Sequence, residues 1–274
     1  MPELPEVETV KETLKRQVLN KRIVSVIVYY DNLIEYPSVS DFKKNIVNQS
    51  INDIERRGKW LVFVLDDYFL LSHLRMEGKY LIRNINDDVC KHEHISFVFD
   101  DSSVLRYRDT RKFGRMHLIR KSDIDFVGPL KDLGLEPWDD MLDCNYLRDK
   151  YKGKRLPIKT VLLDQSIVVG IGNIYADEIL FLCRINPLRV CSSLSDDELN
   201  RIIFNTRNVL SAAIKAGGTT IRSYTSSEGV HGSFQQSLLV HNRCDNCDVC
   251  GQKIIKIKVG GRGTYYCPSC QRDI

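Results

Sequence analysis

Trp60-Leu-Val-Phe-Val-Leu65 is an apolar run between polar turns, which is typical of a buried β-strand. Two similar runs lie on either side of it, Arg22-Ile-Val-Ser-Val-Ile-Val-Tyr29 and His94-Ile-Ser-Phe-Val-Phe99. These runs are rich in β-branched and aromatic residues, and no regular helices alternate with them. The amino-terminal part of the chain therefore predicts a sandwich of antiparallel sheets, since a parallel sheet needs crossover helices between its strands.

The segment before the first run, Met1-Pro-Glu-Leu-Pro-Glu-Val-Glu8, leads into an apolar pattern with helical spacing. Removal of Met1 would leave Pro2 as a free secondary amine beside Glu3 and Glu6. An α-amino group is unprotonated far more often than a lysine at neutral pH, and such an amine can form an iminium with a sugar C1′. The alternative is that Pro2 only precedes a helix, with the acidic residues in its first turn, and this explains the same residues.

Beyond the predicted sandwich, the chain changes to helical periodicity. Gly128-Pro-Leu-Lys-Asp-Leu-Gly-Leu-Glu-Pro137 carries the prolines and glycines of a connection, and Ser195-Asp-Asp-Glu198 resembles a capped helix start. Gly217-Gly218 is expected to end that helix. The residues 217–234 are rich in Gly, Ser and Thr and predict a mobile loop, for which a passive connector is the alternative. The expected domains are 1–130, a linker region 131–150, a helical domain 151–238 and a terminal segment 239–274.

The terminal segment contains two cysteine pairs, Cys247-x-x-Cys250 and Cys267-x-x-Cys270, with sixteen residues between them. This spacing predicts a closed, tetrahedral zinc site with a structural role. Cys244-x-x-Cys247 has the same local spacing, but Gly251 allows a tight turn behind Cys250, so we expect Cys244 to be a spare thiol.

Charge is distributed unevenly along the 274 residues. The net charge is only +4, yet residues 201–274 hold ten Lys or Arg against four Asp or Glu. Between the cysteine pairs, Lys253-Ile-Ile-Lys-Ile-Lys-Val259 and Thr264-Tyr-Tyr266 flank a predicted turn with Arg262 at its tip, a pattern that suits contact with phosphates. No segment resembles a signal peptide or membrane span, so we expect a soluble intracellular protein with a polyanionic partner.

Further residues combine large or charged side chains with predicted loops. Met76, Arg111 and Phe113 follow strand-like runs and could wedge into a base stack, although apolar residues of this kind usually pack in a core. Arg56-Arg-Gly-Lys59 is by itself an ordinary solvated charge run. The turn at Gly170 and Gly172 precedes a probable helix whose amides could bind a phosphate, a weak motif when taken alone.

Together these elements resemble formamidopyrimidine-DNA glycosylase over essentially the whole chain and in the same order. The resemblance is carried by these motifs: Pro2-Glu-Leu-Pro-Glu-Val-Glu8, Lys59, His73-Leu-x-Met76, Arg111-x-Phe-Gly114, Gly172-Asn-Ile-Tyr-Ala-Asp-Glu178, Gly217-Gly-Thr-Thr220 and the two cysteine pairs. It implies an α+β protein with an N-terminal antiparallel β-sandwich and flanking helices. A C-terminal helix-two-turn-helix bundle plus a zinc-ribbon hairpin would follow, with one structural zinc ion.

By this resemblance Pro2 is the nucleophile that attacks C1′ of 8-oxoguanine and formamidopyrimidine nucleotides, and Glu3 is the general acid. Lys59 is expected to take part in catalysis and to contact phosphate, and Glu6 to support the lesion pocket. Successive eliminations would then leave a one-nucleoside gap. The remaining lesion-pocket residues implied by the family are Thr219, Thr220, Ile221, Arg222, Ser223 and Tyr224.

The resemblance also implies how duplex DNA is held. Phosphates flanking the extruded nucleotide would be bound by His73, Asn173 and Arg262, together with Lys59, and Lys159 matches another basic contact of the family. The family's void-filling triad matches Met76, Arg111 and Phe113, and Arg111 is expected to face the orphan base, with a preference for cytosine. The protein is expected to act as a monomer in the bacterial cytoplasm.

This chain departs from the family pattern at a few positions. Arg75 stands where a smaller residue is frequent, and Thr110 and Lys112 replace residues often seen as Pro and Arg. His241-Asn242 occupies a position where Tyr-Gly is usual, which puts one hinge-region or DNA contact in doubt.

Two alternatives stay open at this stage. The related endonuclease VIII type shares the nucleophile and the zinc hairpin but prefers oxidised pyrimidines; Leu4, Val7 and the 217–234 loop argue against it. A non-catalytic zinc-ribbon DNA-binding module would explain the basic C-terminal third, but it gives Pro2, Glu3 and Lys59 no purpose.

Overall fold

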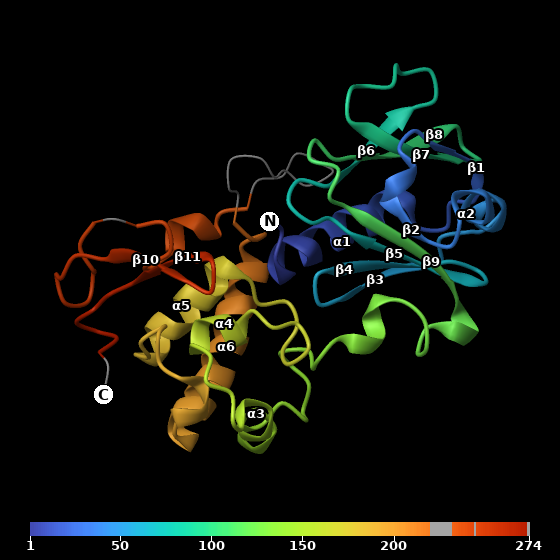
Figure 1. The fold of residues 1–274 in the computed structure, drawn as a ribbon. Helices are drawn as coiled ribbons and strands as arrows, with labels where there is room; N and C mark the ends of the chain where they lie inside the picture. Colours follow the sequence, from blue (N-terminus) through green and yellow to red (C-terminus); the bar gives the residue numbers. More distant parts are fainter. Residues whose placement is uncertain (220–231, 244, 273–274) are drawn as a thin grey trace. The chain divides into compact units, whose positions relative to one another are not determined.

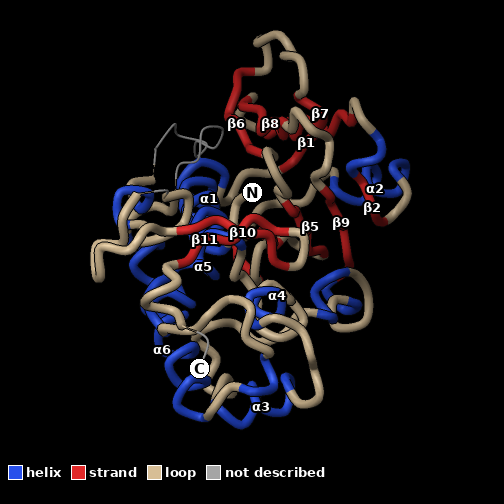
Figure 2. Tube along the Cα trace, turned by 60° about the vertical axis from the view of Figure 1, so that its left-hand side comes forward, coloured by secondary structure: helices blue, strands red, loops and turns tan. Residues whose placement is uncertain are grey.

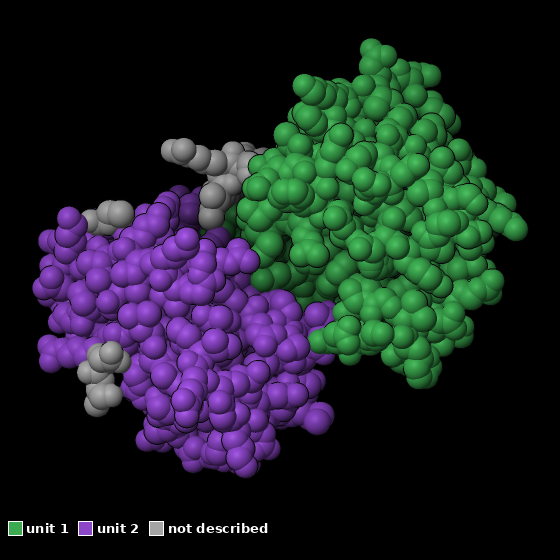
Figure 3. Space-filling model, viewed as in Figure 1, with its two compact units in different colours: residues 1–132, 217–232 green, residues 133–216, 233–274 purple. Residues whose placement is uncertain are grey.

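The computed structural model describes residues 1–219, 232–243 and 245–272, and these form two compact units (Figure 3). Unit 1 contains Met1–Asp132 and the described ends of 217–232, and unit 2 contains Leu133–Ala216 and the described residues from Ser233 onward. The predicted linker region 131–150 is thus largely part of unit 2 and includes a helix. No described helix combines the length and the apolar character that crossing a membrane requires.

The described part of unit 1 forms two sheets and two α-helices (Figure 1). Its helices are α1 (Leu4–Val18) and α2 (Val39–Ile46). Its strands are β1 (Ile23–Val28), β2 (Ile34–Tyr36), β3 (Asp53–Arg57), β4 (Trp60–Val64), β5 (Tyr68–His73), β6 (Lys79–Asn84), β7 (Glu93–Phe99), β8 (Ser103–Arg108) and β9 (Arg115–Arg120). Short 3₁₀ turns lie at η1 (Asp31–Leu33), η2 (Lys121–Asp123) and η3 (Pro129–Asp132).

The strand order confirms the predicted sandwich. One sheet runs β1-β7-β8-β6 and the other β2-β9-β5-β4-β3. Neighbouring strands are antiparallel except for β2 and β9, which are parallel. One apolar core contains residues of both sheets, including Val26, Phe97, Ile54 and Phe63, so the sheets bury a shared set of side chains.

Helix α1 lies against β3 and β4 of the five-stranded sheet (Figure 1). Its apolar stripe, Val7, Val10, Leu14 and Val18, is fully buried in the same core, as the spacing predicts. Since burial of four such side chains stabilises the helix by several kcal/mol, the amino-terminal end of α1 is held in one place on the sheet.

Unit 2 is mainly helical, with a small hairpin (Figures 1 and 2). Its elements are α3 (Cys144–Tyr151), α4 (Ile158–Leu162), α5 (Asn173–Cys183), α6 (Asp196–Lys215), the 3₁₀ turns η4 (Cys191–Ser193) and η5 (Phe234–Ser237), and the strands β10 (Ile255–Val259) and β11 (Arg262–Tyr266). Helix α5 packs against α4, α6 and β11. Most of its residues are buried, which makes it the central helix of this unit.

The local signals around α6 are confirmed. Ser195 Oγ accepts the Glu198 N–H at 3.3 Å, and the Glu198 carboxylate accepts the Ser195 N–H at 2.8 Å. The helix ends at Lys215, before Gly217 with φ +72°. The hairpin prediction needs one correction, because the turn is Gly260-Gly261 and Arg262 is the first residue of β11, paired with Val259.

Candidate functional site

Two buried acidic residues lie at the amino-terminal end of α1. Glu3 is 2% exposed and Glu6 is 4% exposed, and the Glu3 N–H donates to Glu6 Oε2 at 2.9 Å. The other oxygen of Glu6, Oε1, accepts the backbone N–H of Thr219 at 2.7 Å and its hydroxyl at 3.0 Å. Pro2 is also buried and immediately precedes these groups. Glu6 therefore ties the start of the 217–234 segment to the helix that carries Pro2 and Glu3.

Gly218 allows this contact, because its φ is +78° and a Cβ there would lie 2.7 Å from Glu6 Oε1. We expect Gly218→Ala to lower the free energy of unfolding by about 2 kcal/mol more than Gly217→Ala, since the former also displaces hydrogen bonds to a buried carboxylate. Gly217 has a similar φ, +72°, but the one described atom that its Cβ would meet is the Cα of Gly232, at 3.5 Å. Denaturant unfolding compares the two, and equal losses would show that the Glu6 contact is unimportant.

Lys59 lies in the β3–β4 turn, which is bonded to the same helix. Arg56 Nε donates to Glu8 Oε2 at 2.7 Å, and Arg56 Nη1 donates to the Gly58 carbonyl at 3.0 Å. Burial raises the pKa of Glu8, but hydrogen bonds from Lys11 and Arg56 outweigh it and leave this pKa below its ordinary value. Glu8 thus stays ionised and holds the turn that places the buried Lys59.

His73 ends β5 as a neutral hydrogen-bond donor. Its Nδ1 accepts the Arg75 N–H at 2.9 Å, so the ring proton is on Nε2. Burial lowers the pKa of His73 to about 3, and the charges of Arg75 and Lys59 act in the same direction. The ring also meets Trp60 edge-on, with centroids 4.8 Å apart. It therefore remains uncharged throughout the physiological pH range, and it can donate to a phosphate without titrating.

The loop that carries Arg111 and Phe113 is built around Asp109. The carboxylate of this fully buried residue accepts the Arg111 N–H at 3.0 Å and the Gly114 N–H at 2.8 Å, and its backbone carbonyl bonds the His94 ring at 2.8 Å. A Cβ at position 114 would lie 1.9 Å from the Tyr107 hydroxyl, so this position requires glycine. Arg111 and Phe113 are exposed, with the guanidinium 4.8 Å from the ring centre. Met76 is half-buried in the loop after β5.

In unit 2, the first residue of α5 is bonded to the hairpin. Asn173 Nδ2 donates to the Gly263 carbonyl at 2.9 Å, beside the exposed Arg262. Lys159 is fully buried, and its ammonium donates to the Asn173 carbonyl at 2.7 Å and to Asp177 Oδ1 at 2.6 Å. Lys159 therefore supports Asn173 from inside the protein in this structure, and its contact with DNA stays a prediction.

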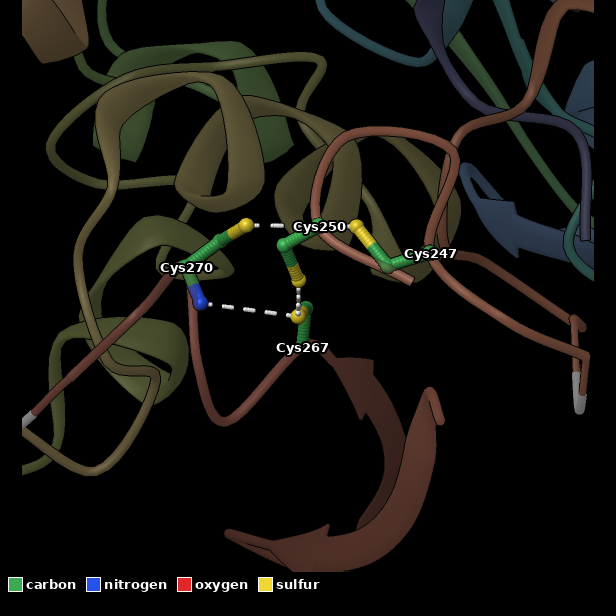
Figure 4. A group of neighbouring side chains, drawn as sticks. All are labelled: Cys247, Cys250, Cys267 and Cys270. Atoms are coloured by element: carbon green, nitrogen blue, oxygen red, sulfur yellow. Dashed lines mark hydrogen bonds between the residues drawn. The ribbon is translucent and has the colours of Figure 1, made fainter. Parts of the chain in front are cut away.

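The four predicted cysteine ligands form one site (Figure 4). Their sulfur atoms all lie within 4.8 Å of one another, with Cys247 3.9 Å from Cys270 and Cys250 3.4 Å from Cys267. Tetrahedral Zn–S bonds of about 2.3 Å place sulfur atoms about 3.8 Å apart, so the cluster fits one zinc ion. All four positions would be taken by protein, which makes the zinc structural. Cys244 lies outside the described residues.

The zinc site is also part of the core of unit 2. Cys247 and Cys267 are buried with Phe181 of α5, Val240 and Tyr265. The side chain of Gln271 donates to the Ile185 carbonyl at 2.9 Å. The hairpin is thus packed against α5, the helix that begins with Asn173.

Some of the predicted residues can be compared with the structure and others cannot. Pro2, Glu3, Glu6 and Thr219 belong to one group at the start of α1, and the cysteines form another. Thr220, Ile221, Arg222, Ser223 and Tyr224 lie outside the described residues. The sequence reading missed the supporting roles of Glu8, Arg56 and Asp109. Only their position inside or next to the motifs could have indicated them.

Comparison with known proteins agrees with this geometry. Residues 1–116 match the formamidopyrimidine-DNA glycosylase N-terminal domain, 133–225 match the H2TH domain of that enzyme, and 245–272 match the zinc finger found in FPG and IleRS. Formamidopyrimidine-DNA glycosylase of Oceanobacillus iheyensis is 50% identical over 273 residues, covering 99% of this chain and 98% of the relative. The Bacillus cereus enzyme of the same name is 46% identical over the full length of both chains.

Solved structures agree as well. A Lactococcus lactis FPG mutant in complex with DNA containing Fapy-dG has a TM-score of 0.93 and 37% identity, covering 99% of this chain and 100% of that one. The Lactococcus lactis Fpg in complex with DNA containing an abasic site has a TM-score of 0.91 with the same identity and coverage. The chain belongs to the formamidopyrimidine-DNA glycosylase family.

Proposed function

We propose that this protein is a bifunctional DNA glycosylase and AP lyase that removes oxidised purines from duplex DNA in base excision repair. The buried acidic group at the start of α1 carries the proposal, since Glu3 and Glu6 follow Pro2 directly and are 2% and 4% exposed. Buried carboxyl groups beside a nucleophile are costly to keep unless they serve chemistry or hydrogen bonding. The names of the relatives, and the Fapy-dG in the DNA of one solved complex, support formamidopyrimidines as substrates. We propose 8-oxoguanine as a second substrate from the resemblance of the motifs.

The first step uses the amine of Pro2 once Met1 is removed. Its lone pair forms a bond to C1′, the electrons of the N-glycosidic bond leave with the base, and the base takes the proton that the amine nitrogen loses. Glu3 donates a proton to O4′ as the C1′–O4′ bond breaks, so the sugar opens and an iminium forms. A positioned carboxylic acid contributes typically 10²–10⁴-fold to such a step.

The iminium then acts as the electron sink for strand cleavage. Loss of a proton from C2′ expels the 3′ phosphate, and a second elimination expels the 5′ phosphate. Water hydrolyses the remaining iminium, which releases the unsaturated sugar fragment as an aldehyde and restores the amine. The product is a gap with a phosphate at each end.

DNA is held by groups of both units. His73 and Lys59 of unit 1, and Asn173 and Arg262 of unit 2, are proposed to bind phosphates near the lesion. Asn173 has a second amide N–H besides the one given to Gly263, and Arg262 is exposed. The zinc, when bound, holds the shape of the hairpin that carries Arg262.

Met76, Arg111 and Phe113 are proposed to fill the space left by the extruded nucleotide. Exposure of Arg111 and Phe113 on a loop fixed by Asp109 supports this role, because a wedge needs a rigid base and a solvent-facing tip. Arg111 would bond the orphan cytosine, and one copy of the chain would act on one lesion. The residues 217–234 are proposed to contact the flipped base, and Thr219 among them is bonded to Glu6.

An incision assay tests this function. The protein is incubated with duplexes that carry 8-oxoguanine opposite cytosine, thymine glycol opposite adenine, or no damage. We expect cleavage of the 8-oxoguanine strand with phosphate at both ends of the gap, and none of the undamaged duplex. Preferential cleavage at thymine glycol would instead support the endonuclease VIII type, and binding without cleavage of any duplex would support a non-catalytic module.

A further inference from the structure

Two loops of unit 1 carry the proposed wedge residues, and both cross from one sheet of the sandwich to the other. The first wedge loop, 74–78, carries Met76 and joins β5 to β6. The second wedge loop, 109–114, carries Arg111 and Phe113 and joins β8 to β9. Strands β5 and β9 belong to the five-stranded sheet, and β6 and β8 belong to the four-stranded one. The two loops therefore make the same crossing in opposite directions.

The residues that flank the two wedge loops are paired with each other. His73, which precedes the first loop, pairs with Arg115, which follows the second. In the other sheet, Lys79 pairs with Arg108 in the same way. Strand pairing thus places the ends of both loops next to each other, but it does not set the spacing of the loop tips.

Each wedge loop is also closed by hydrogen bonds of its own. In the first loop, the Gly78 N–H donates to the Leu74 carbonyl at 2.9 Å. In the second, the carboxylate of Asp109 accepts the N–H groups of Arg111 and Gly114. These bonds act within a loop, so they leave the spacing between the two loops open.

The hydroxyl of Tyr107 lies between the two wedge loops. A Cβ added at Gly78 of the first loop would lie 2.2 Å from this oxygen, and a Cβ added at Gly114 of the second would lie 1.9 Å from it. Real Cβ atoms do not approach their neighbours so closely, so one oxygen occupies the space of a side chain at both positions. Both glycines are buried. The Tyr107 hydroxyl therefore contacts the backbone of both loops.

The ring of Tyr107 is held firmly in the core. Its side chain is 1% exposed and lies directly opposite Tyr80 in the pairing of β6 with β8. The two rings are inclined at 64° with their centroids 5.2 Å apart. Close-packed interiors transmit displacements, and a gap too small for water loses its contacts outright. Since neither Gly78 nor Gly114 has a side chain to fill such a gap, loss of the hydroxyl would leave the two loops free to shift relative to each other.

We propose that Tyr107 is a positioning residue for base extrusion, whose hydroxyl sets the spacing of the two wedge loops. Met76 and the pair of Arg111 and Phe113 then enter the base stack as one rigid unit. The inference deepens the proposed function and rests on it, because it concerns the same wedge. Tyr107 is buried and acts through the loops, without touching DNA. Insertion of side chains from two loops at one base step needs both tips at a fixed distance.

The chain offers a matched pair of variants. Tyr107→Phe removes the hydroxyl between the loops and keeps the ring. Tyr80→Phe makes the same change in the same core, at a side chain that is also 1% exposed. Its hydroxyl donates to Ser72 Oγ at 2.7 Å, and it is not among the atoms nearest to a Cβ at Gly78 or Gly114. The melting temperature of each variant records its general loss of stability.

Stopped-flow fluorescence measures insertion of the wedge. The duplex carries 8-oxoguanine opposite cytosine, with 2-aminopurine as the neighbouring base, whose fluorescence rises when its stacking is broken. Excess protein is mixed with this duplex, and the rate of the rise is recorded as a function of protein concentration. Affinity for an undamaged duplex is measured separately by anisotropy.

At saturating protein we expect Tyr107→Phe to slow the fluorescence rise about tenfold, because small misplacements of positioning groups slow a step by up to about 10²-fold. Tyr80→Phe should follow the wild type. Both variants should bind the undamaged duplex normally, since phosphate contacts do not need the wedge. An unchanged rate in Tyr107→Phe, or equal slowing in both variants, would overturn the proposal. Absence of any rise with the wild type would instead contradict the proposed function.

A double-mutant cycle adds a readout that a general loosening of the core would not change. Groups that act as a unit have effects that do not multiply. With Tyr107 in place, Met76→Ala combined with Phe113→Ala should therefore slow insertion little more than the slower single variant does. In the Tyr107→Phe background the two effects should multiply. Effects that multiply in both backgrounds would contradict a rigid wedge.

Discussion

Glu3→Gln is expected to lower the rate of base excision from an 8-oxoguanine duplex by about 10²–10⁴-fold. The amide has nearly the same size and can stay at the start of α1, but it cannot deliver a proton to the opening sugar. Binding of the lesion duplex should therefore remain close to that of the wild type. Single-turnover excision and a separate binding titration measure the two effects.

Glu12→Gln is the matched control, because it makes the same change on the same helix at a side chain that is 52% exposed. It should excise at the rate of the wild type. If Glu3→Gln also kept the wild-type rate on intact 8-oxoguanine, the general acid would have to be another group.

Cys267→Ser should have the second large effect, through loss of the zinc ion and of DNA binding. A structural zinc site contributes about 10–16 kcal/mol of binding free energy at neutral pH, and Cys267 is fully buried among the apolar contacts of the hairpin. Loss of the site would release β11 from its place. The hydrogen bonds from the Tyr265 N–H to Asp177 and from Asn173 to the Gly263 carbonyl would then break. Zinc analysis and fluorescence anisotropy with a lesion duplex report these two losses.

Cys244→Ser separates the two possible cysteine pairs. The cluster in the structure contains Cys247, Cys250, Cys267 and Cys270, so Cys244→Ser should keep one zinc ion per chain and bind DNA normally. Equal loss of zinc from Cys244→Ser and Cys267→Ser would mean that the ligand set is wrong.

The features that the sequence predicts well are local. The apolar runs around Trp60, Ile23 and Ile95 form strands because each run alone satisfies the pattern of a buried strand. The capping box of α6 depends on Ser195 and Glu198 only, and the zinc site depends on spacing within two short motifs.

Other features depend on residues far apart in the chain, and these could not be predicted. The parallel pairing of β2 with β9 involves a strand of three residues, which is too short to show a pattern. Glu8 bonds Arg56, and Lys159 bonds Asp177, only because the fold brings the partners together. The sequence alone does not distinguish a buried lysine in an ion pair from an exposed lysine that binds DNA.

Supporting residues show the same limit within the candidate site. Asp109 lies next to the predicted wedge residues, yet its role became visible only from its bonds to Arg111 and Gly114. Glu6 was expected to support the lesion pocket, but the sequence gives no indication that it bonds Thr219, more than two hundred residues away. Sequence motifs identify the side chains that act, whereas the side chains that position them are identified only by their contacts in the structure.

Borohydride trapping tests the central claim most directly. The protein, with Met1 removed and zinc bound, is incubated with an 8-oxoguanine:cytosine duplex and borohydride, and the crosslinked peptide is identified by mass spectrometry. We expect a covalent complex at the amino-terminal Pro2 that forms far more strongly on 8-oxoguanine than on thymine glycol or undamaged DNA. A crosslink at a lysine, or no crosslink at all, would contradict the assignment of Pro2 as the nucleophile.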